Sequence, residues 1–385
     1  MIDATFWNGR RVLVTGHSGF IGGWLSVWLH SIGAKVIGFS LDPPTEPSFF
    51  EAACLARRIT SLKGDIRSPE LLSQVICDQS PDIILHLAAQ PLVFHGRNRP
   101  VETFETNVGG TVNVLEQAHQ AKTGALVIVS TDKVYDSTRA RPPFREHDPI
   151  GSKDVYGASK VCGEFAVEAY ADRFSADGIG LAIVRAGNAI GGGDWAPFRL
   201  VPDVARALQG DRHLCLRQPL SVRPWQHALD MAAGILCVAQ ACARSRSFIG
   251  PWNIGPPQPR PATAQALAEL TAEMWGGRLV LKPAQDNAAP EADVLSLDTT
   301  KARREFGLQS PWSLRETVGK TVEWYKAAAA GADMWTTTLA QIQSYCSQLP
   351  APGQPLSRAT YHKGSVTNES GQSNVAWRLP IRNLG

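Results

Sequence analysis

The stretch that decides the fold lies near the start of the chain and reads Val12-Leu13-Val14-Thr15-Gly16-His17-Ser18-Gly19-Phe20-Ile21-Gly22. Its apolar beginning predicts a buried strand, its glycines predict a tight turn, and the apolar residues after them predict a helix. In such a turn Gly16 allows the bend, Gly19 lets a pyrophosphate approach the backbone, and Gly22 lets the helix pack against the strand. The helix N-terminus adds free N–H groups and a positive dipole end. This stretch therefore predicts a phosphate cradle, with G-x-x-G-x-x-G spacing in place of the commoner G-x-G-x-x-G.

Short apolar runs alternate with amphipathic segments up to about residue 187. The runs are apolar throughout, which predicts a parallel sheet covered by helices on both faces. Right-handed crossovers then give a doubly wound α/β sheet of the Rossmann type. The predicted strands are Arg11–Thr15, Lys35–Ser40, Ile83–Ala88, Ala125–Ser130 and Leu181–Ala186, and the predicted helices are Ile21–Ile32, Pro69–Gln79, Pro100–Gln120 and Tyr156–Phe174.

Glycines and prolines break the rest of the chain into shorter segments. We expect a dinucleotide-binding Rossmann domain over residues 1–187, to which a later strand and helix return near 220–255. A smaller, interleaved C-terminal substrate-binding domain is expected over residues 188–330. Residues 348–385 have few apolar side chains, which predicts a flexible tail. The helices predicted in the second half are Pro202–Gln209, Ala228–Ala243, Thr263–Trp275, Thr299–Phe306 and Ser313–Lys326.

Composition excludes several classes of protein. The 385 residues carry a formal net charge of only +3, with basic and acidic residues interspersed, which argues against a nucleic-acid or membrane-surface partner. The seven cysteines form an odd set without disulfide spacing, so we expect buried free thiols, and no Cys/His cluster has the spacing of a metal site. The apolar stretch Phe20–Leu29 is too short to span a membrane, and no signal peptide precedes the first strand. Cytoplasmic localisation is the resulting expectation.

Two acidic residues, after the second and third apolar runs, lie where they could bind the adenosine part of a dinucleotide. Asp42 follows the second predicted strand, where an acid binds ribose hydroxyls and repels a 2′-phosphate, favouring NAD over NADP. Alternatively, Asp42 only opens the turn at Pro43-Pro44. Asp65 lies after the next short apolar stretch, from which it could hold the adenine amino group.

A tyrosine and a lysine lie four residues apart on one face of a predicted helix. We expect the Lys160 cation to lower the pKa of Tyr156, so that the phenol can accept a proton from a sugar hydroxyl. The lysine can also reach the nicotinamide ribose. Such a pair by itself is often a surface contact, but this one follows the strand that ends at Ser130-Thr131 by one strand–helix unit. That position favours an active site.

These motifs together resemble the extended short-chain dehydrogenase/reductase family. The shared residues are Gly16, Gly19 and Gly22, His86-Leu87-Ala88-Ala89-Gln90, Asn107, and the Tyr156/Lys160 pair. Longer segments resemble the CDP-glucose 4,6-dehydratases within it, namely Leu41–Thr45, Ala89–Val93, Thr131–Lys133, Arg185–Trp195 and Arg223–His227. The likeness extends from Phe6 to about Lys326.

The resemblance implies a nucleotide-diphosphate sugar as substrate, a tightly bound and recycled NAD, and a homodimer formed through helices Pro100–Gln120 and Tyr156–Phe174. It also implies a place in deoxysugar biosynthesis, such as that of lipopolysaccharide O-antigens. The implied cofactor residues are Gly16, Ser18, Gly19, Phe20, Ile21, Gly22, Asp42, Asp65, Ile66, Ala88, Ala89, Gln90, Asn107, Ser130, Tyr156, Lys160 and Arg185. The implied substrate residues are Gln90, Asn188, Arg199, Arg217, Arg223, Trp225 and His227, of which His227 could equally be a packed residue.

The catalytic residues that the resemblance implies are Thr131, Asp132, Lys133, Tyr156 and Lys160. Tyr156 takes the O4 proton while C4 hydride goes to NAD, and Thr131 holds O4. Lys133 removes the C5 proton, provided that burial and Lys160 keep it neutral, and Asp132 protonates the leaving C6 oxygen. Related dehydratases carry Asp-Glu where this chain and the CDP-glucose enzymes carry Asp-Lys.

Three departures from the CDP-glucose group lie near the expected site. The group usually has lysine at Ile21, arginine at Phe94, and Asp-Pro immediately before Tyr156, where this chain has Val155. The sugar or base could therefore differ, or the elimination could be lost. An NAD-dependent epimerase or reductase on the same fold is the alternative, although an epimerase needs no Asp132-Lys133 pair. A non-catalytic dinucleotide sensor is a further alternative, against which the intact tyrosine–lysine pair argues.

Overall fold

The computed structural model describes residues 2–210, 213–245, 250–256, 262–283 and 294–349. The predicted flexible tail lies outside the described residues, apart from its first two positions. The predicted domain boundaries at 187 and 330 stay predictions.

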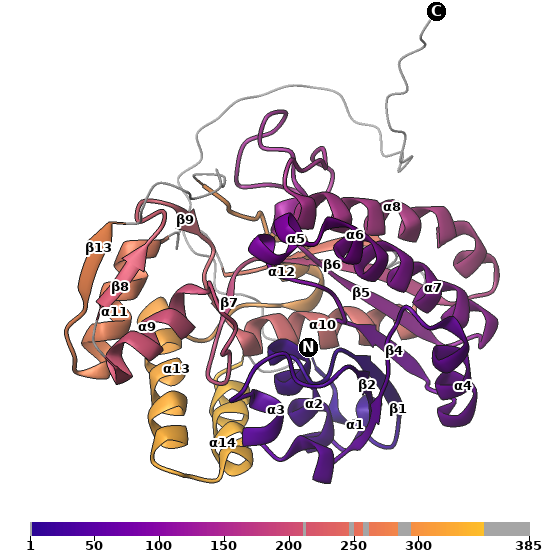
Figure 1. Cartoon of the computed structure of the whole chain (residues 1–385). Helices are drawn as coiled ribbons and strands as arrows, with labels where there is room; N and C mark the ends of the chain where they lie inside the picture. Colours follow the sequence, from indigo (N-terminus) through magenta and orange to yellow (C-terminus); the bar gives the residue numbers. More distant parts are fainter. Residues whose placement is uncertain (1, 211–212, 246–249, 257–261, 284–293, 350–385) are drawn as a thin grey trace, which may run out of the picture. The chain divides into compact units, whose positions relative to one another are not determined.

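The centre of the fold is a seven-stranded parallel sheet with the order β11-β6-β5-β4-β1-β2-β3 (Figure 1). This arrangement confirms the predicted doubly wound sheet of the Rossmann type. The short strand β3 was not predicted, because its residues are only partly buried and show no continuous apolar run. The strands are β1 (Arg11–Thr15), β2 (Lys35–Ser40), β3 (Thr60–Lys63), β4 (Ile83–His86), β5 (Ala125–Thr131), β6 (Gly180–Ala186) and β11 (Gly250–Ile254).

Successive residues of each strand face opposite sides of the sheet, so two separate cores form. On one side, Leu13 and Ile84 pack against helices α4, α7 and α8. On the other side, Val12 and Leu85 pack against α2 and α10. Burial on both faces explains why the strands are apolar throughout. The covering helices are α2 (Phe20–Ser31), α4 (Pro69–Gln79), α7 (Gly110–Gln120), α8 (Val155–Ala176) and α10 (Ala228–Arg244).

The segment predicted as one helix from Pro100 to Gln120 has three parts. It begins as α6 (Pro100–Phe104), continues through a π-helical turn (Glu105–Gly109), and ends as α7. The π turn contains the buried Asn107, and such turns are frequent at functional sites. The remaining short helical elements of this half are α1 (Ala4–Trp7), α3 (Phe49–Ala52), α5 (Val93–Asn98) and the 3₁₀ turns Leu55–Arg57 and Asp132–Val134.

Three small two-stranded sheets and five helices complete the described chain. The sheets pair β7 (Ala189–Ile190) with β10 (Gln226–His227), β9 (Val222–Arg223) with β12 (Ala262–Thr263), and β8 (His213–Leu216) with β13 (Val280–Pro283). The helices are α9 (Leu200–Gln209), α11 (Ala264–Trp275), α12 (Thr300–Phe306), α13 (Leu314–Ala329) and α14 (Met334–Ser347).

Helix α14 was not predicted, and it belongs to the packed part of the molecule. Asp333 caps its N-terminus, and Trp335, Ile342 and Tyr345 join the core beside α2. The Tyr345 hydroxyl also donates to Asp230 Oδ1 of α10 at 2.7 Å. None of the helices in the described part of the chain is both long and apolar enough to cross a bilayer.

The cysteines correct one prediction. All seven are free, as expected, but only Cys237 and Cys242 are buried. The other five are exposed: Cys54 lies in a turn, and Cys77, Cys162, Cys215 and Cys346 occupy solvent-facing positions of helices or strands.

Candidate active site

The strand order reverses between β1 and β4, and the loops that follow these two strands diverge there. In doubly wound sheets, ligands bind at the carboxyl ends of the strands beside such a reversal. The glycine loop follows β1, and Leu87-Ala88-Ala89-Gln90 follows β4. The residues predicted from sequence thus meet at one edge of the sheet.

The glycine loop has no room for side chains at two of its positions. Gly16 has φ +80°, and a Cβ on it would lie 2.7 Å from the Ala88 nitrogen. A Cβ on Gly22 would lie 2.1 Å from the Gly16 oxygen. Gly19 is the N-cap of α2, so the first N–H groups of that helix open onto the loop. This backbone cradle fits a dinucleotide pyrophosphate.

A buried histidine network supports the cradle, and sequence reasoning missed it. His17 Nε2 lies 2.7 Å from Ser61 Oγ, and His17 Nδ1 lies 2.9 Å from Ser40 Oγ. Ser40 Oγ in turn donates to Ser18 Oγ at 2.9 Å. The ring covers Gly38, where a Cβ would lie 2.2 Å from it, and burial lowers the pKa of His17 to about 4. Ser40 and Ser61, on the neighbouring strands β2 and β3, could have indicated this network. The sequence does not give the strand register that brings both of them to His17.

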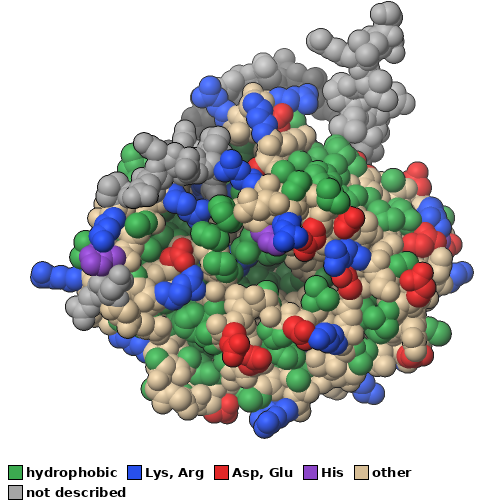
Figure 2. Space-filling model, viewed as in Figure 1, with side chains coloured by type: hydrophobic (Ala, Val, Ile, Leu, Met, Phe, Trp, Pro, Cys, Tyr) green, Lys and Arg blue, Asp and Glu red, His purple; other side chains and the backbone are tan. Residues whose placement is uncertain are grey.

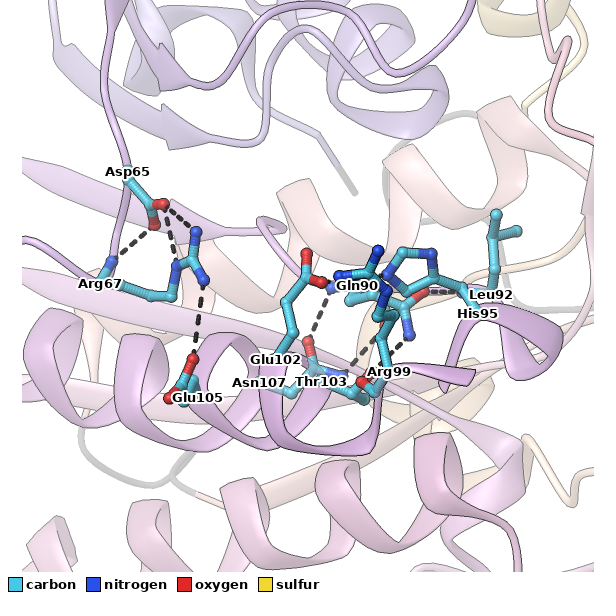
Figure 3. Close-up of polar contacts among 10 residues, drawn as sticks. All are labelled: Asp65, Arg67, Gln90, Leu92, His95, Arg99, Glu102, Thr103, Glu105 and Asn107. Carbon is cyan, nitrogen blue, oxygen red and sulfur yellow. Dashed lines mark hydrogen bonds and ion pairs between the residues drawn. The ribbon is translucent and has the colours of Figure 1, made fainter. Parts of the chain in front are cut away.

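The two acids predicted at the adenosine end both have cationic partners. Asp42 Oδ2 pairs with Lys63 Nζ at 2.5 Å, and both side chains are largely exposed. Asp65 accepts hydrogen bonds from Arg67, which lower the pKa of that carboxyl, and Arg67 also lies 3.8 Å from Glu105 (Figure 3). Ile66 is buried beside these residues. Their cofactor contacts stay predictions.

Asn107 joins the loop after β4 to the helix that carries Tyr156. Its Oδ1 accepts from the Gln90 nitrogen at 2.7 Å, and its Nδ2 donates to Gln90 O and to Ser159 Oγ. Ser159 Oγ donates to the Tyr156 carbonyl at 2.7 Å. Gln90 Nε2 donates to Thr103 Oγ1 of α6, as Figure 3 shows. The network therefore positions two predicted site residues relative to each other.

Asp132 lies in the turn after β5 and is 2% exposed. Thr131 Oγ1 donates to its Oδ1 at 3.2 Å, while its Oδ2 has no hydrogen-bond partner among the described residues. Burial raises the pKa of Asp132, against the lowering effect of the Lys133 and Arg223 charges. A raised pKa favours the protonated carboxyl, which is the form that can act as a proton donor.

Tyr156 and Lys160 occupy the first turns of α8. Lys160 Nζ donates to the Val129 carbonyl at 2.8 Å, and burial lowers the pKa of Lys160 to about 8. Burial raises the pKa of Tyr156 to about 12, opposed by the Thr131 hydroxyl and the Arg199 charge. The predicted net lowering of the Tyr156 pKa is therefore wrong for the protein alone, because burial outweighs the groups that favour the phenolate.

Arg199 and Arg223 approach the catalytic groups, and Arg217 lies farther out. Arg199 pairs with Asp194 at 3.0 Å, and its charge acts on the Tyr156 phenol. Arg223 is 3% exposed, and its charge acts on Asp132. Arg217 Nη2 donates to the Phe198 carbonyl at 2.8 Å. Asn188 is half-buried at the end of β6, where its carbonyl accepts from Gln226.

The structure gives packing roles to Trp225 and His227, which were predicted to contact substrate. Trp225 is buried in the core, and its Nε1 donates to the Ala262 carbonyl. His227 is fully buried between Trp24 and Trp312, and its Nδ1 accepts from a backbone N–H as the cap of α10. Packing thus encloses the Trp225 and His227 rings, and their predicted substrate contacts stay predictions.

Arg185, predicted as a cofactor residue, instead forms a buried ion pair. Its Nη2 lies 2.6 Å from Glu164 Oε2, and its Nη1 donates to Tyr135 Oη and to the Glu146 carbonyl. Ser130 Oγ donates to Glu164 Oε1, so this predicted cofactor residue belongs to the same network. Every nitrogen of the guanidinium is engaged within the protein, and the predicted cofactor contact of Arg185 stays a prediction.

A Rossmann cradle facing a tyrosine–lysine pair defines the class of site, and comparisons with known proteins define the family. A model of the NAD dependent epimerase/dehydratase family matches residues 12–255. The chain is 41% identical over 355 residues to the CDP-glucose 4,6-dehydratase of Salmonella typhimurium, covering 90% of this chain and 99% of that protein. The chain belongs to the NAD dependent epimerase/dehydratase family.

Solved structures agree with this assignment. A dTDP-glucose 4,6-dehydratase from Streptomyces venezuelae with NAD bound has a TM-score of 0.71 and 27% identity, covering 84% of this chain and 99% of that chain. A UDP-glucose-4-epimerase from Stenotrophomonas maltophila with NAD bound has a TM-score of 0.74 and 22% identity, covering 84% and 100% of the two chains. The second similarity shows the fold alone.

Proposed function

We propose that this protein is an NAD-dependent nucleotide-sugar 4,6-dehydratase that converts CDP-glucose to its 4-keto-6-deoxy product. The observation that carries the proposal is the buried Asp132, next to Lys133 and close to Tyr156, because elimination at C5 and C6 requires an acid and a base. The 41% identity to a CDP-glucose 4,6-dehydratase over nearly the whole chain supports the same substrate.

The glycine cradle and the Asn107 network fit NAD. Residues 16–22 would hold the pyrophosphate, Asp42 and Asp65 the adenosine end, and Lys160 the nicotinamide ribose. Bound NAD would supply a reversible hydride carrier for C4 and C6 of the sugar, so no net reduction of the cofactor is expected. A 2′-phosphate on the cofactor would meet the carboxylate of Asp42, which favours NAD over NADP.

The side chains around the hexose divide the proton transfers between them. Tyr156 accepts the proton of the O4 hydroxyl, which the Thr131 hydroxyl helps to hold. The C4 ketone then acidifies C5–H, and Lys133 removes that proton. Asp132 is kept protonated by burial and gives its proton to the departing C6 oxygen, so that water leaves. The cation of Arg199 favours the phenolate of Tyr156.

Epimerisation or reduction on the same scaffold is the competing activity. Neither reaction removes a C6 hydroxyl, so neither needs the buried acid at Asp132.

A homodimer through α6, α7 and α8 is a further part of the proposal. The half-exposed Phe165 and the exposed Val101 and Phe104 on these helices support it. The free cysteines support a reducing compartment such as the cytoplasm. The product class belongs to deoxysugar biosynthesis.

The role of Lys133 is tested by Lys133→Ala, with Lys326→Ala as the matched control because Lys326 is exposed on α13. Both proteins are mixed with CDP-glucose while cofactor absorbance and sugar mass are followed. We expect Lys133→Ala to accumulate enzyme-bound reduced cofactor without losing water from the sugar, and the control to behave as wild type. Water loss at the wild-type rate in Lys133→Ala would remove the assigned role.

A further inference from the structure

Two phenylalanine rings from distant parts of the chain meet at the mouth of the site. Phe94 lies on α5 and Phe198 lies in the loop before α9, and their ring centroids are 4.6 Å apart. They are 46% and 49% exposed, which is unusual for two large apolar side chains in mutual contact. Figure 2 shows the hollow in this face of the molecule with hydrophobic side chains along its border.

Both rings belong to segments that reach residues of the site. A Cβ on Gly96 of α5 would lie 3.5 Å from both Gln90 Nε2 and the Tyr156 nitrogen, so α5 packs directly against the site. Phe198 immediately precedes Arg199, whose charge acts on the Tyr156 phenol. Phe94 and Phe198 therefore lie within two residues of positions that contact or act on Tyr156.

The backbone of Phe198 is held in a costly conformation. Its φ is +63°, in the left-handed region that bulky residues rarely adopt. Arg217 fixes it, because Nη2 donates to the Phe198 carbonyl at 2.8 Å and the guanidinium lies 5.5 Å from the ring centroid. Strain of this kind persists where surrounding contacts impose it, frequently at ligand sites. The ring of Phe198 is thus presented in a fixed position.

We propose that Phe94 and Phe198 form an aromatic clasp over the hexose of the bound nucleotide sugar, an inference that rests on the proposed function. In the proposed reaction the C4 hydroxyl lies at Tyr156, so aromatic rings on the segments next to Tyr156 are placed to border the hexose. The C–H face of a pyranose packs well against aromatic rings, and a closed clasp excludes water from the elimination. An arginine at residue 94, usual in the CDP-glucose group, would give a charged border instead.

The clasp is tested by comparing the Kd of CDP-glucose with that of CDP, measured by calorimetry. Phe94→Ala and Phe198→Ala should each raise the Kd of CDP-glucose about threefold to tenfold and change the Kd of CDP less than about twofold. Phe94→Tyr retains the ring and should bind both ligands as wild type does. Alanine at residue 198 keeps the Cβ that this backbone already carries, so backbone strain is unchanged.

Three results would overturn the clasp. These are an equal weakening of both ligands, no weakening of either, or a wild type that binds CDP-glucose no more tightly than CDP. A wild type that binds CDP-glucose more tightly but fails to dehydrate it would refute the proposed function and leave the clasp to be judged by the variant ratios.

Discussion

Replacing Arg185 by methionine tests whether this side chain holds the fold or the cofactor. The Arg185 and Glu164 side chains are 4% and 2% exposed, and they are joined by contacts of 2.6, 3.0 and 3.2 Å. Methionine fills similar space but leaves the Glu164 carboxylate buried, with the Ser130 hydroxyl as its remaining hydrogen-bond donor among the described residues. Removing one partner of a buried pair costs about 3–5 kcal/mol. We expect the free energy of unfolding to fall by that amount.

Arg173→Met is the matched control, because Arg173 pairs with Glu116 at 3.2 Å while the two side chains are 50% and 31% exposed. A pair of this kind contributes about 0–1 kcal/mol. Urea unfolding gives both values, and calorimetry gives the NAD affinity of each folded variant. Arg185→Met should bind NAD as wild type does, and adding Glu164→Leu should recover stability by removing the unpaired charge. A small stability loss together with a tenfold weaker NAD complex would refute this reasoning and restore the cofactor role.

Three further changes test other parts of the site. Gly22→Ala should yield a protein purified without NAD, because its Cβ would lie 2.1 Å from the Gly16 oxygen. Gly109→Ala is the control and should retain the cofactor, because the space around Gly109 is open. Equal NAD content in the two variants would contradict this prediction. Asp132→Asn should lower turnover about 10²–10⁴-fold and leave reduced cofactor on the enzyme, and near-normal turnover would exclude Asp132 as the acid. The pKa of His227 is lowered from 6.5 to about 3 by burial, so the unfolded chain binds more protons between these values and stability must fall as pH drops below about 6.5. His227→Asn should reduce this dependence in unfolding measured at pH 7 and pH 5, and an unchanged slope would contradict it.

The central sheet and the cradle could be predicted because local patterns determine them. Strands buried on both faces must be apolar throughout, and the glycine spacing reports close approaches within eleven residues. The Tyr156/Lys160 pair and Thr131-Asp132 were likewise recognisable from local order. The contacts between distant segments that complete these features, such as the strand pairings and the approach of Ala88 to Gly16, leave a local mark in the apolar runs and the glycine spacing.

The features that the sequence did not reveal depend on tertiary partners. Arg185 looks like a free cation until Glu164, far along the chain, is placed opposite it. Trp225 and His227 look like ligands until helix α10 and the surrounding tryptophans enclose them. The raised pKa of Tyr156 results from burial, which the periodicity of a helix does not predict. The hydrogen bonds of His17 become clear only when β2 and β3 are aligned in the sheet.

The measurement that tests the central claim most directly is incubation of the purified protein with CDP-glucose and no added cofactor. Mass spectrometry of the nucleotide sugar then follows the loss of water. The account predicts a 4-keto-6-deoxy product lighter by one water, formed in many turnovers without net cofactor reduction. No water loss from CDP-, dTDP-, UDP- or GDP-glucose would contradict it.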